Sequence, residues 1–199
     1  MIALRPFARA DFARLIAWIP SAEFLLQWAG PAFTFPLDTA QLDAYLAESE
    51  GEAPSRMIFT AVESDTATAV GHIELARIDR RNRSATLSRV LIGEAGRRGQ
   101  GAGLEMVRRI LQIGFERLTL HRIDLVVFDF NASAIACYES AGFVKEGCLR
   151  EARRFGEEYW SLVQMSILDT EWSARVDPPR GDGANDAGSA SSPTRGTHA

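Results

Sequence analysis

The sequence predicts a mixed α/β protein with a mostly antiparallel sheet of about seven strands, flanked by about four helices. Three segments of alternating apolar and polar residues follow one another in the middle of the chain. A glycine-rich turn joins the third segment to an amphipathic helix, and two further strand-like segments close the pattern. Strands close in sequence pair antiparallel, whereas a strand reached through a helix is expected to lie parallel.

The chain of 199 residues is long enough for one domain with its own core. We assign this domain to residues 1–172. Residues 173–199 contain Val176 as their single large aliphatic residue, among many Gly, Ser, Ala, Pro and Asp. Such a composition buries little apolar surface, so this tail is predicted to be disordered.

Composition excludes several classes of protein. A net charge of -4 argues against a dedicated nucleic-acid-binding protein. The two cysteines, Cys137 and Cys148, do not have the spacing of a metal site, so no metal is expected. No apolar run resembles a signal peptide or reaches transmembrane length. The sequence therefore predicts a cytoplasmic protein without a membrane partner.

The first 50 residues are predicted to form one strand and three helices. Pro6 closes the strand and Pro20 ends the first helix, because proline lacks the backbone N–H that both elements need. Ser21 and Asp38 are residues that cap helix N-termini well. The expected elements are a strand over residues 2–5 and helices over 11–19, 22–28 and 38–49.

An aromatic segment, residues 28–36, separates the second and third of these helices. It is too rich in proline and glycine for a helix and contains Trp28, Phe33 and Phe35. Either these rings attach a loop to the core, or they form part of a substrate-binding surface, since loops often carry binding residues. We retain all three as candidate substrate-binding residues.

The rest of the chain alternates between strands and helices. Period-2 patterns predict strands over 57–63, 70–78 and 84–92. Helical spacing of apolar residues begins at Leu104, and a strand rich in branched residues follows over 121–128. Asn131 caps a helix over 132–141 that Gly142 ends. Two strands, over 143–150 and 158–168, are predicted to form a hairpin.

The turn between Ile92 and Leu104 predicts a binding site for a diphosphate. Glycines at positions 99, 101 and 103 let a ligand approach the backbone closely. The first N–H groups of the following helix have no partner in the helix and point toward such an anion. The spacing differs from that of a dinucleotide-binding turn, and no Gly-Lys-Ser/Thr follows as in a Walker loop.

Two motifs resemble the GNAT superfamily of acetyl-coenzyme A-dependent N-acetyltransferases. Arg98, Gly101 and Gly103 match the Arg-x-x-Gly-x-Gly motif of that family. Asn131 and Tyr138 belong to a segment that matches its second motif, at the expected distance downstream. The two motifs occur in the family's order with a predicted strand between them, which makes the resemblance specific.

The resemblance extends over residues 2–172 and implies a GNAT fold whose sheet is splayed at the coenzyme cleft. It implies direct transfer of an acetyl group from acetyl-coenzyme A to a primary amine in a ternary complex. Leu4 to Phe7, Gly147 to Arg150 and Trp160 resemble the branch that includes ribosomal-protein N-terminal acetyltransferases. The acceptor would be a protein N terminus or a small amine, and the protein a monomer or homodimer.

The resemblance also implies where the coenzyme binds. Its pantetheine would lie between residues 91–92 and the strand over 121–128, hydrogen-bonded like an added strand. Its pyrophosphate would accept N–H groups from residues 98–103, and an N–H near Ile92 would polarise the thioester carbonyl. Asn131 would be both a helix cap and a coenzyme contact. The candidate coenzyme-binding residues are Leu91, Ile92, Arg97, Arg98, Gly99, Gln100, Gly101, Ala102, Gly103 and Asn131.

Two residues are candidates for proton transfer. The family resemblance makes Tyr138 the acid that protonates the departing thiolate. Glu74 is the candidate base, with a solvated strand carboxylate as the alternative. His72, on the same strand face, is a candidate substrate-binding residue or a structural histidine. Cys137 is predicted to be an inert thiol, because neighbouring residues of a helix point about 100° apart and only Tyr138 would face the thioester.

Two other functions remain open at this point. An aminoglycoside or polyamine acetyltransferase would favour an acidic acceptor cleft that holds a polycation. A non-catalytic module that binds acyl-coenzyme A as a sensor is the second alternative.

Overall fold

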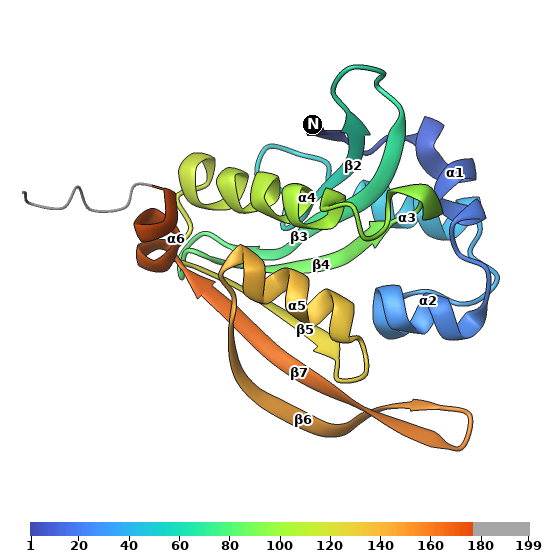
Figure 1. The fold of residues 1–199 in the computed structure, drawn as a ribbon. Helices are drawn as coiled ribbons and strands as arrows, with labels where there is room; N and C mark the ends of the chain where they lie inside the picture. Colours follow the sequence, from blue (N-terminus) through green and yellow to red (C-terminus); the bar gives the residue numbers. More distant parts are fainter. Residues whose placement is uncertain (177–199) are drawn as a thin grey trace, which may run out of the picture.

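The structure is a computed structural model that describes residues 1–176, without the side chains of Ala95 and Val176. Seven strands form one sheet in the order β1-β2-β3-β4-β5-β7-β6 (Figure 1). All neighbours pair antiparallel except β4 and β5, which confirms the predicted mixed sheet. The strands are β1 (Ile2–Pro6), β2 (Met57–Glu63), β3 (Ala69–Asp79), β4 (Ser84–Ile92), β5 (Arg122–Phe128), β6 (Val144–Phe155) and β7 (Glu158–Leu168).

The described residues form six α-helices, more than the expected number of about four. The three N-terminal helices pack on one face of the sheet, and the others belong to the core on the opposite face. A last helix continues past residue 172, the predicted domain boundary. The helices are α1 (Phe12–Ala17), α2 (Ala22–Ala29), α3 (Thr39–Ala47), α4 (Ala102–Gln112), α5 (Ala132–Ala141) and α6 (Asp169–Val176).

Helix boundaries follow from the capping residues. The side chains of Ser21, Asp38 and Asn131 each accept a hydrogen bond from the backbone N–H three residues on, at 3.1, 2.8 and 3.2 Å. These bonds satisfy N–H groups that the helix itself leaves unpaired. Gly142 ends α5 with a φ of 112°, a conformation that favours glycine. All three predicted caps are confirmed.

Strand β3 lies between two apolar cores. Ile73 and Leu75 are fully buried in the core beneath α4 and α5. His72 and Glu74, which alternate with them, are buried on the opposite face, beneath the N-terminal helices. Because successive side chains of a strand point to opposite faces, His72 and Glu74 lie inside the core beneath the N-terminal helices.

The sheet opens between β4 and β5, as predicted. The two strands pair in parallel only over Ser84–Thr86 and Arg122–Asp124. Beyond Thr86 the paired positions end, while β4 continues to Ile92 and β5 to Phe128. The opening lies between α2 and α5 in Figure 1, and it leaves backbone groups of both strands without a strand partner.

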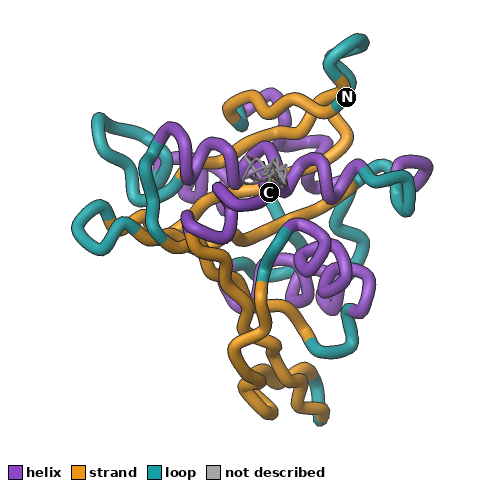
Figure 2. Tube along the Cα trace, turned by 60° about the vertical axis from the view of Figure 1, so that its left-hand side comes forward, coloured by secondary structure: helices purple, strands orange, loops and turns teal. Residues whose placement is uncertain are grey.

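The C-terminal part differs most from prediction. Strand β6 continues to Phe155 instead of residue 150, and the β6–β7 hairpin extends away from the rest of the molecule (Figure 1 and Figure 2). Helix α6 runs to Val176, so residues 173–176 of the predicted tail are helical. Its Trp172 stacks on Phe115 with ring centroids 5.9 Å apart, a packing contact that composition alone does not reveal. The remaining tail, 177–199, lies outside the described residues.

Candidate active site

Two clefts meet at the opening between β4 and β5. The larger, of about 590 Å³, extends to the glycine-rich turn before α4 and is called here the glycine-loop cleft. The smaller, of about 310 Å³, extends to β3 and is called the Glu74 cleft. The residues that line both are Gln27, Trp28, Val90, Asn131, Ala134 and Tyr138.

The glycine-loop cleft ends at the N-terminus of α4. Gly101 is the N-cap residue with a φ of 82°, and no side chain caps this helix. A Cβ at Gly101 would have no neighbour within 4 Å, and one at Gly103 would meet Cys137 Sγ at 3.7 Å. The glycines therefore keep open a space in front of unpaired N–H groups, which is where an anion is stabilised.

Most of the predicted coenzyme-binding residues line this cleft: Leu91, Ile92, Arg97, Arg98, Gly99, Gly101, Gly103 and Asn131. Gln100 and Ala102 are absent from its lining. The side chain of Gln100 instead donates to the carbonyl of Gly96 at 2.7 Å. Arg97 forms an ion pair with Glu63, and Arg98 Nε donates to the carbonyl of Ile92 at 3.0 Å. Both arginines are thus positioned by the protein itself.

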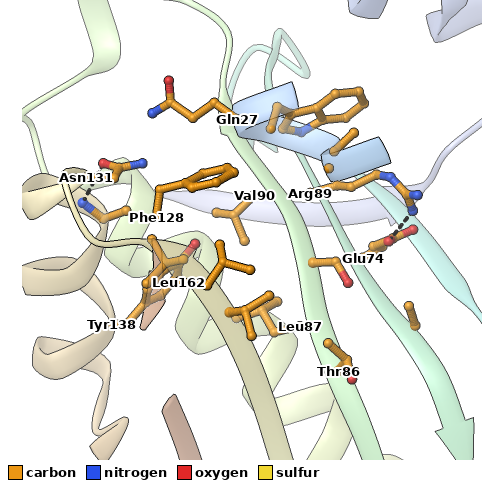
Figure 3. A pocket seen from close by; sticks show the side chains of 18 of the residues that line it. Gln27, Glu74, Thr86, Leu87, Arg89, Val90, Phe128, Asn131, Tyr138 and Leu162 are labelled. Carbon is orange, nitrogen blue, oxygen red and sulfur yellow. Dashed lines mark hydrogen bonds and ion pairs between the residues drawn. The ribbon is translucent and has the colours of Figure 1, made fainter. Parts of the chain in front are cut away.

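Tyr138 stands where the two clefts meet. Figure 3 shows it across the Glu74 cleft from Glu74 and Arg89. Its ring packs edge to face against Phe143, at 5.9 Å between centroids, and the residue is 8% exposed. Burial raises the pKa of the Tyr138 hydroxyl well above its ordinary value, because a phenolate would be poorly solvated there. The hydroxyl therefore stays protonated at neutral pH.

Cys137 also lines the glycine-loop cleft. The expectation that Cys137 and Tyr138 cannot both face the thioester stays a prediction, although both side chains reach this wide cleft. Cys137 lies beside Gly103, whereas Tyr138 lies at the junction. Burial raises the pKa of the thiol, which keeps it protonated and weakly nucleophilic.

Glu74 is held by a buried hydrogen-bond network. Arg56 Nη1 donates to both of its carboxylate oxygens, each at 2.8 Å. Arg89 forms an ion pair with Oε1, and the Tyr45 hydroxyl donates to Oε2 at 2.6 Å. The carboxylate is fully buried, so these partners replace the water it has lost.

A bulge in β4 brings Arg89 into this network. Glu74 pairs with Ser88, but two residues of β4, Arg89 and Val90, then lie opposite the single residue Ile73. Arg89 has a φ of 50°, a left-handed conformation that is rare in a strand. The extra residue turns the Arg89 side chain onto the same face as Glu74, a common effect of bulges near active sites.

His72 is buried behind this network. Its Nε2 lies 3.0 Å from the Tyr45 hydroxyl, and the rings of Phe7 and Trp28 meet it edge to face at 4.9 and 5.5 Å. Burial, together with the positive charge of Arg89, lowers the pKa of His72 to about 3. The imidazole is therefore neutral at pH 7.

The four predicted substrate-binding residues have different positions. Trp28 lines both clefts. Phe33 stacks on Trp28 at 5.9 Å, and His72 contacts the same Trp28 ring edge to face. Neither Phe33 nor His72 lines a cleft. Phe35 is 42% exposed and also lies outside both linings. The aromatic segment therefore supports the cleft mainly through Trp28.

Sequence analysis missed Tyr45, Arg56 and Arg89. Tyr45 fitted the apolar stripe of α3, so its hydroxyl carried no separate signal. Arg56 precedes β2 in a loop, and Arg89 reaches Glu74 only because of the bulge. An unpaired carboxylate in a buried strand was the one available indication that basic partners must exist.

Two general expectations concern metals and membranes. Within residues 1–176, no three His, Cys, Asp or Glu side chains are grouped so that they could bind a metal ion. None of the described helices is long and apolar enough to cross a membrane.

Comparisons with known proteins agree with the fold and motifs. The profile of the acetyltransferase (GNAT) domain matches residues 2–144. A spermidine N(1)-acetyltransferase of Vibrio cholerae is 32% identical over 114 residues, which are 57% of this chain and 65% of that protein. An uncharacterized prophage-derived N-acetyltransferase of Bacillus subtilis is 38% identical over 93 residues, 47% of this chain and 51% of that protein.

A longer match is found to the spermidine N(1)-acetyltransferase of Escherichia coli K12, with 24% identity over 89% of this chain and 91% of that protein. Among solved structures, the Vibrio cholerae spermidine N-acetyltransferase in complex with coenzyme A and spermine has a TM-score of 0.74. It is 24% identical and covers 86% of this chain and 97% of that one, which shows a shared fold. The profile covers most of the chain and the fold agrees with it, so the protein belongs to the GNAT acetyltransferase family.

Proposed function

We propose that this protein is an acetyl-coenzyme A-dependent N-acetyltransferase that acts on a primary amine by direct transfer. The observation that carries the proposal is the position of Tyr138, which lines both clefts. A donor in the glycine-loop cleft and an acceptor in the Glu74 cleft would meet beside its hydroxyl. This arrangement suits a ternary complex better than a covalent enzyme intermediate.

The residues of the glycine-loop cleft fit acetyl-coenzyme A. The open space at Gly101 and Gly103 and the uncapped N-terminus of α4 suit its pyrophosphate. Arg98 adds a positive charge, and the unpaired edges of β4 and β5 suit the amide groups of pantetheine. Bound acetyl-coenzyme A supplies an acetyl group activated as a thioester.

Tyr138 is the residue to which we assign proton donation. Its raised pKa keeps the hydroxyl protonated at neutral pH, so a proton is present beside the place where the thiolate would form. It would donate that proton as the carbon–sulfur bond breaks. Cys137, with its own raised pKa, stays a neutral thiol in the wall of the cleft.

Glu74 was the sequence candidate for the base, and its contacts favour a different role. A base needs a lone pair directed at the acceptor nitrogen. Both oxygens of Glu74 already accept bonds from Arg56, and each has a second partner in Arg89 or Tyr45. We therefore assign Glu74 to positioning of the two arginines that face the acceptor.

The charge of the Glu74 cleft helps to deliver a neutral amine. An ammonium group needs to lose its proton before it attacks, and nearby positive charge lowers its pKa. Arg56 and Arg89 supply that charge beside the cleft. A strong protein base is then unnecessary, and water in the cleft can take the proton.

A polyamine acceptor is the second candidate, favoured by the names of the relatives from Vibrio cholerae and Escherichia coli. Such a polycation prefers an acidic cleft. A coenzyme-binding sensor without activity is the third. Calorimetry with acetyl-coenzyme A, followed by coenzyme A release with peptides, amino acids, spermidine and kanamycin, tests all three. Binding without turnover of any acceptor would favour the sensor and contradict our proposal.

A further inference from the structure

Two buried N–H groups beside the Glu74 cleft have no hydrogen-bond partner. They are Nε1 of Trp28 and Nε of Arg89, and no acceptor is within reach among the residues that the structure describes. Trp28 is 9% exposed, as is the side chain of Arg89, and both residues line the cleft. Buried donors are nearly always paired, so two unpaired ones at a single cleft indicate a ligand that brings the acceptors.

Arginines outnumber carboxylates in the lining of the cleft. Its lining contains four arginines, at positions 56, 77, 89 and 153, and one carboxylate among the described residues, Glu74. That carboxylate is already saturated by Arg56, Arg89 and Tyr45. Arg56 also pairs with Glu48, and Arg77 lies 3.8 Å from Asp124, so among the described residues Arg153 is the lining arginine without a carboxylate partner. Its positive charge attracts an anionic group and repels a second ammonium.

Arg89 is held rigidly for such a contact. Its guanidinium lies 5.0 Å from the centroid of the Phe33 ring and 4.7 Å from that of Tyr45. Phe33 in turn stacks on Trp28 at 5.9 Å. The two unpaired donors are thus joined through one aromatic stack, and little conformational freedom remains to be lost when a ligand binds.

We infer that the acceptor is a primary amine that carries a carboxylate, whose oxygens accept from Trp28 Nε1 and Arg89 Nε. The inference rests on the proposed acetyltransferase function and specifies its substrate class. The acid group would hold the acceptor while its amine faces Tyr138 at the opposite side of the cleft (Figure 3). A volume of about 310 Å³ limits the bound part to roughly one or two amino-acid residues.

This chemistry has two sources, a free amino acid and a peptide with an acidic residue at its N terminus. Steady-state turnover of purified protein with saturating acetyl-coenzyme A separates them. One arm compares amino acids with their amides, and the other compares N-terminal Asp or Glu peptides with Asn or Gln peptides. Spermidine serves as the polycationic competitor.

We expect kcat/KM for at least one carboxylate acceptor to exceed that for its amide by about tenfold or more, because a site built for a hydrogen-bonding group rejects analogues that lack it. Trp28→Phe removes one donor and keeps a ring, so it should reduce this ratio. Arg89→Lys keeps the charge without the Nε donor and should do the same. Trp172→Phe, in α6 and outside both cleft linings, is the matched control.

Equal use of acid and amide, or a preference for spermidine, would overturn the inference and leave the acetyltransferase proposal intact. The inference is also overturned if no carboxylate acceptor is used. If, in addition, acetyl-coenzyme A fails to bind in calorimetry, the proposed function falls as well. Should a variant unfold, the acid-to-amide comparison on the unmodified protein still decides.

Discussion

Arg56 Nη1 donates to both carboxylate oxygens of Glu74, each at 2.8 Å, and the side chain of Glu74 is fully buried. The pair joins the residue before β2 to the middle of β3. Arg89 joins β4 to the same carboxylate. One buried anion therefore fixes three strands beside the acceptor cleft, and its removal should affect stability and substrate binding together.

Glu74→Gln should destabilise the protein by about 3–5 kcal/mol, because removing one partner of a buried ion pair leaves the others uncompensated. Urea unfolding measures this loss. Glu48→Gln is the matched control, since Glu48 also pairs with Arg56 but its side chain is 54% exposed. That change should cost less than about 1 kcal/mol. A stable Glu74→Gln protein that has lost only turnover would instead restore Glu74 as the base.

Local signals predicted much of the fold. Strands β2, β4 and β7 and helix α5 have the predicted bounds, because alternation, caps and terminal glycines are encoded by neighbouring residues. The extent of β6 was missed, since this exposed edge strand has no buried face to set an apolar alternation. Helix α6 was not predicted, because its stability depends on packing of Trp172.

The candidate site was predictable only where a motif describes it. Gly101, Gly103, Asn131 and Tyr138 all line the predicted cleft. The position of Arg89 could not be predicted, because it depends on a bulge between two strands rather than on neighbouring residues.

Gly103→Ala should weaken binding of acetyl-coenzyme A by about tenfold or more, equivalent to about 1.4 kcal/mol. The added methyl would extend into the cleft beside Cys137, 3.7 Å from its sulfur, which is an ordinary contact. The fold should therefore be kept, and alanine favours the helix. Gly101→Val is a weaker test, because a φ of 82° strains a branched residue by itself.

Calorimetry measures the affinity, with a melting curve to confirm the fold. Gly96→Ala is the control, since a Cβ there would have no neighbour within 4 Å and the residue does not line the cleft. Unchanged affinity in Gly103→Ala would place the pyrophosphate elsewhere.

Acid should destabilise the protein through His72. Its pKa is lowered to about 3 in the folded protein, below the ordinary 6.5 of an unfolded chain. The unfolded state therefore binds more protons below pH 6.5, and stability is lost as pH falls from 6.5 toward 3. Between pH 7 and pH 4 this amounts to roughly 3 kcal/mol.

His72→Gln removes the titrating group, so its unfolding free energy should change less between pH 7 and pH 4 than that of the unmodified protein. His121→Gln, at a side chain that is 54% exposed, is the control for a histidine substitution outside the core. Identical curves for His72→Gln and the unmodified protein would show that His72 is not the titrating group.

Tyr138→Phe should reduce kcat by about 10²-fold or more while the affinity for acetyl-coenzyme A stays nearly the same. The ring remains packed against Phe143, so only the proton donor is lost. General acid catalysis typically contributes a factor of this size to kcat. Calorimetry and steady-state turnover with a saturating acceptor separate binding from chemistry. Tyr159→Phe, at a residue that is 57% exposed, is the control and should be unaffected.

The pH dependence of turnover provides a second test of the acid role of Tyr138. An acid acts in its protonated form, so turnover falls only when pH rises through its pKa. Burial raises the pKa of Tyr138 above the ordinary value of 10.0, so the unmodified protein should show no loss of kcat from this group below pH 10. A fall in kcat as pH rises through about 8 that persists in Tyr138→Phe would belong to another group. Unreduced kcat in Tyr138→Phe would exclude the acid role altogether, because the phenylalanine has no proton to give to the departing thiolate.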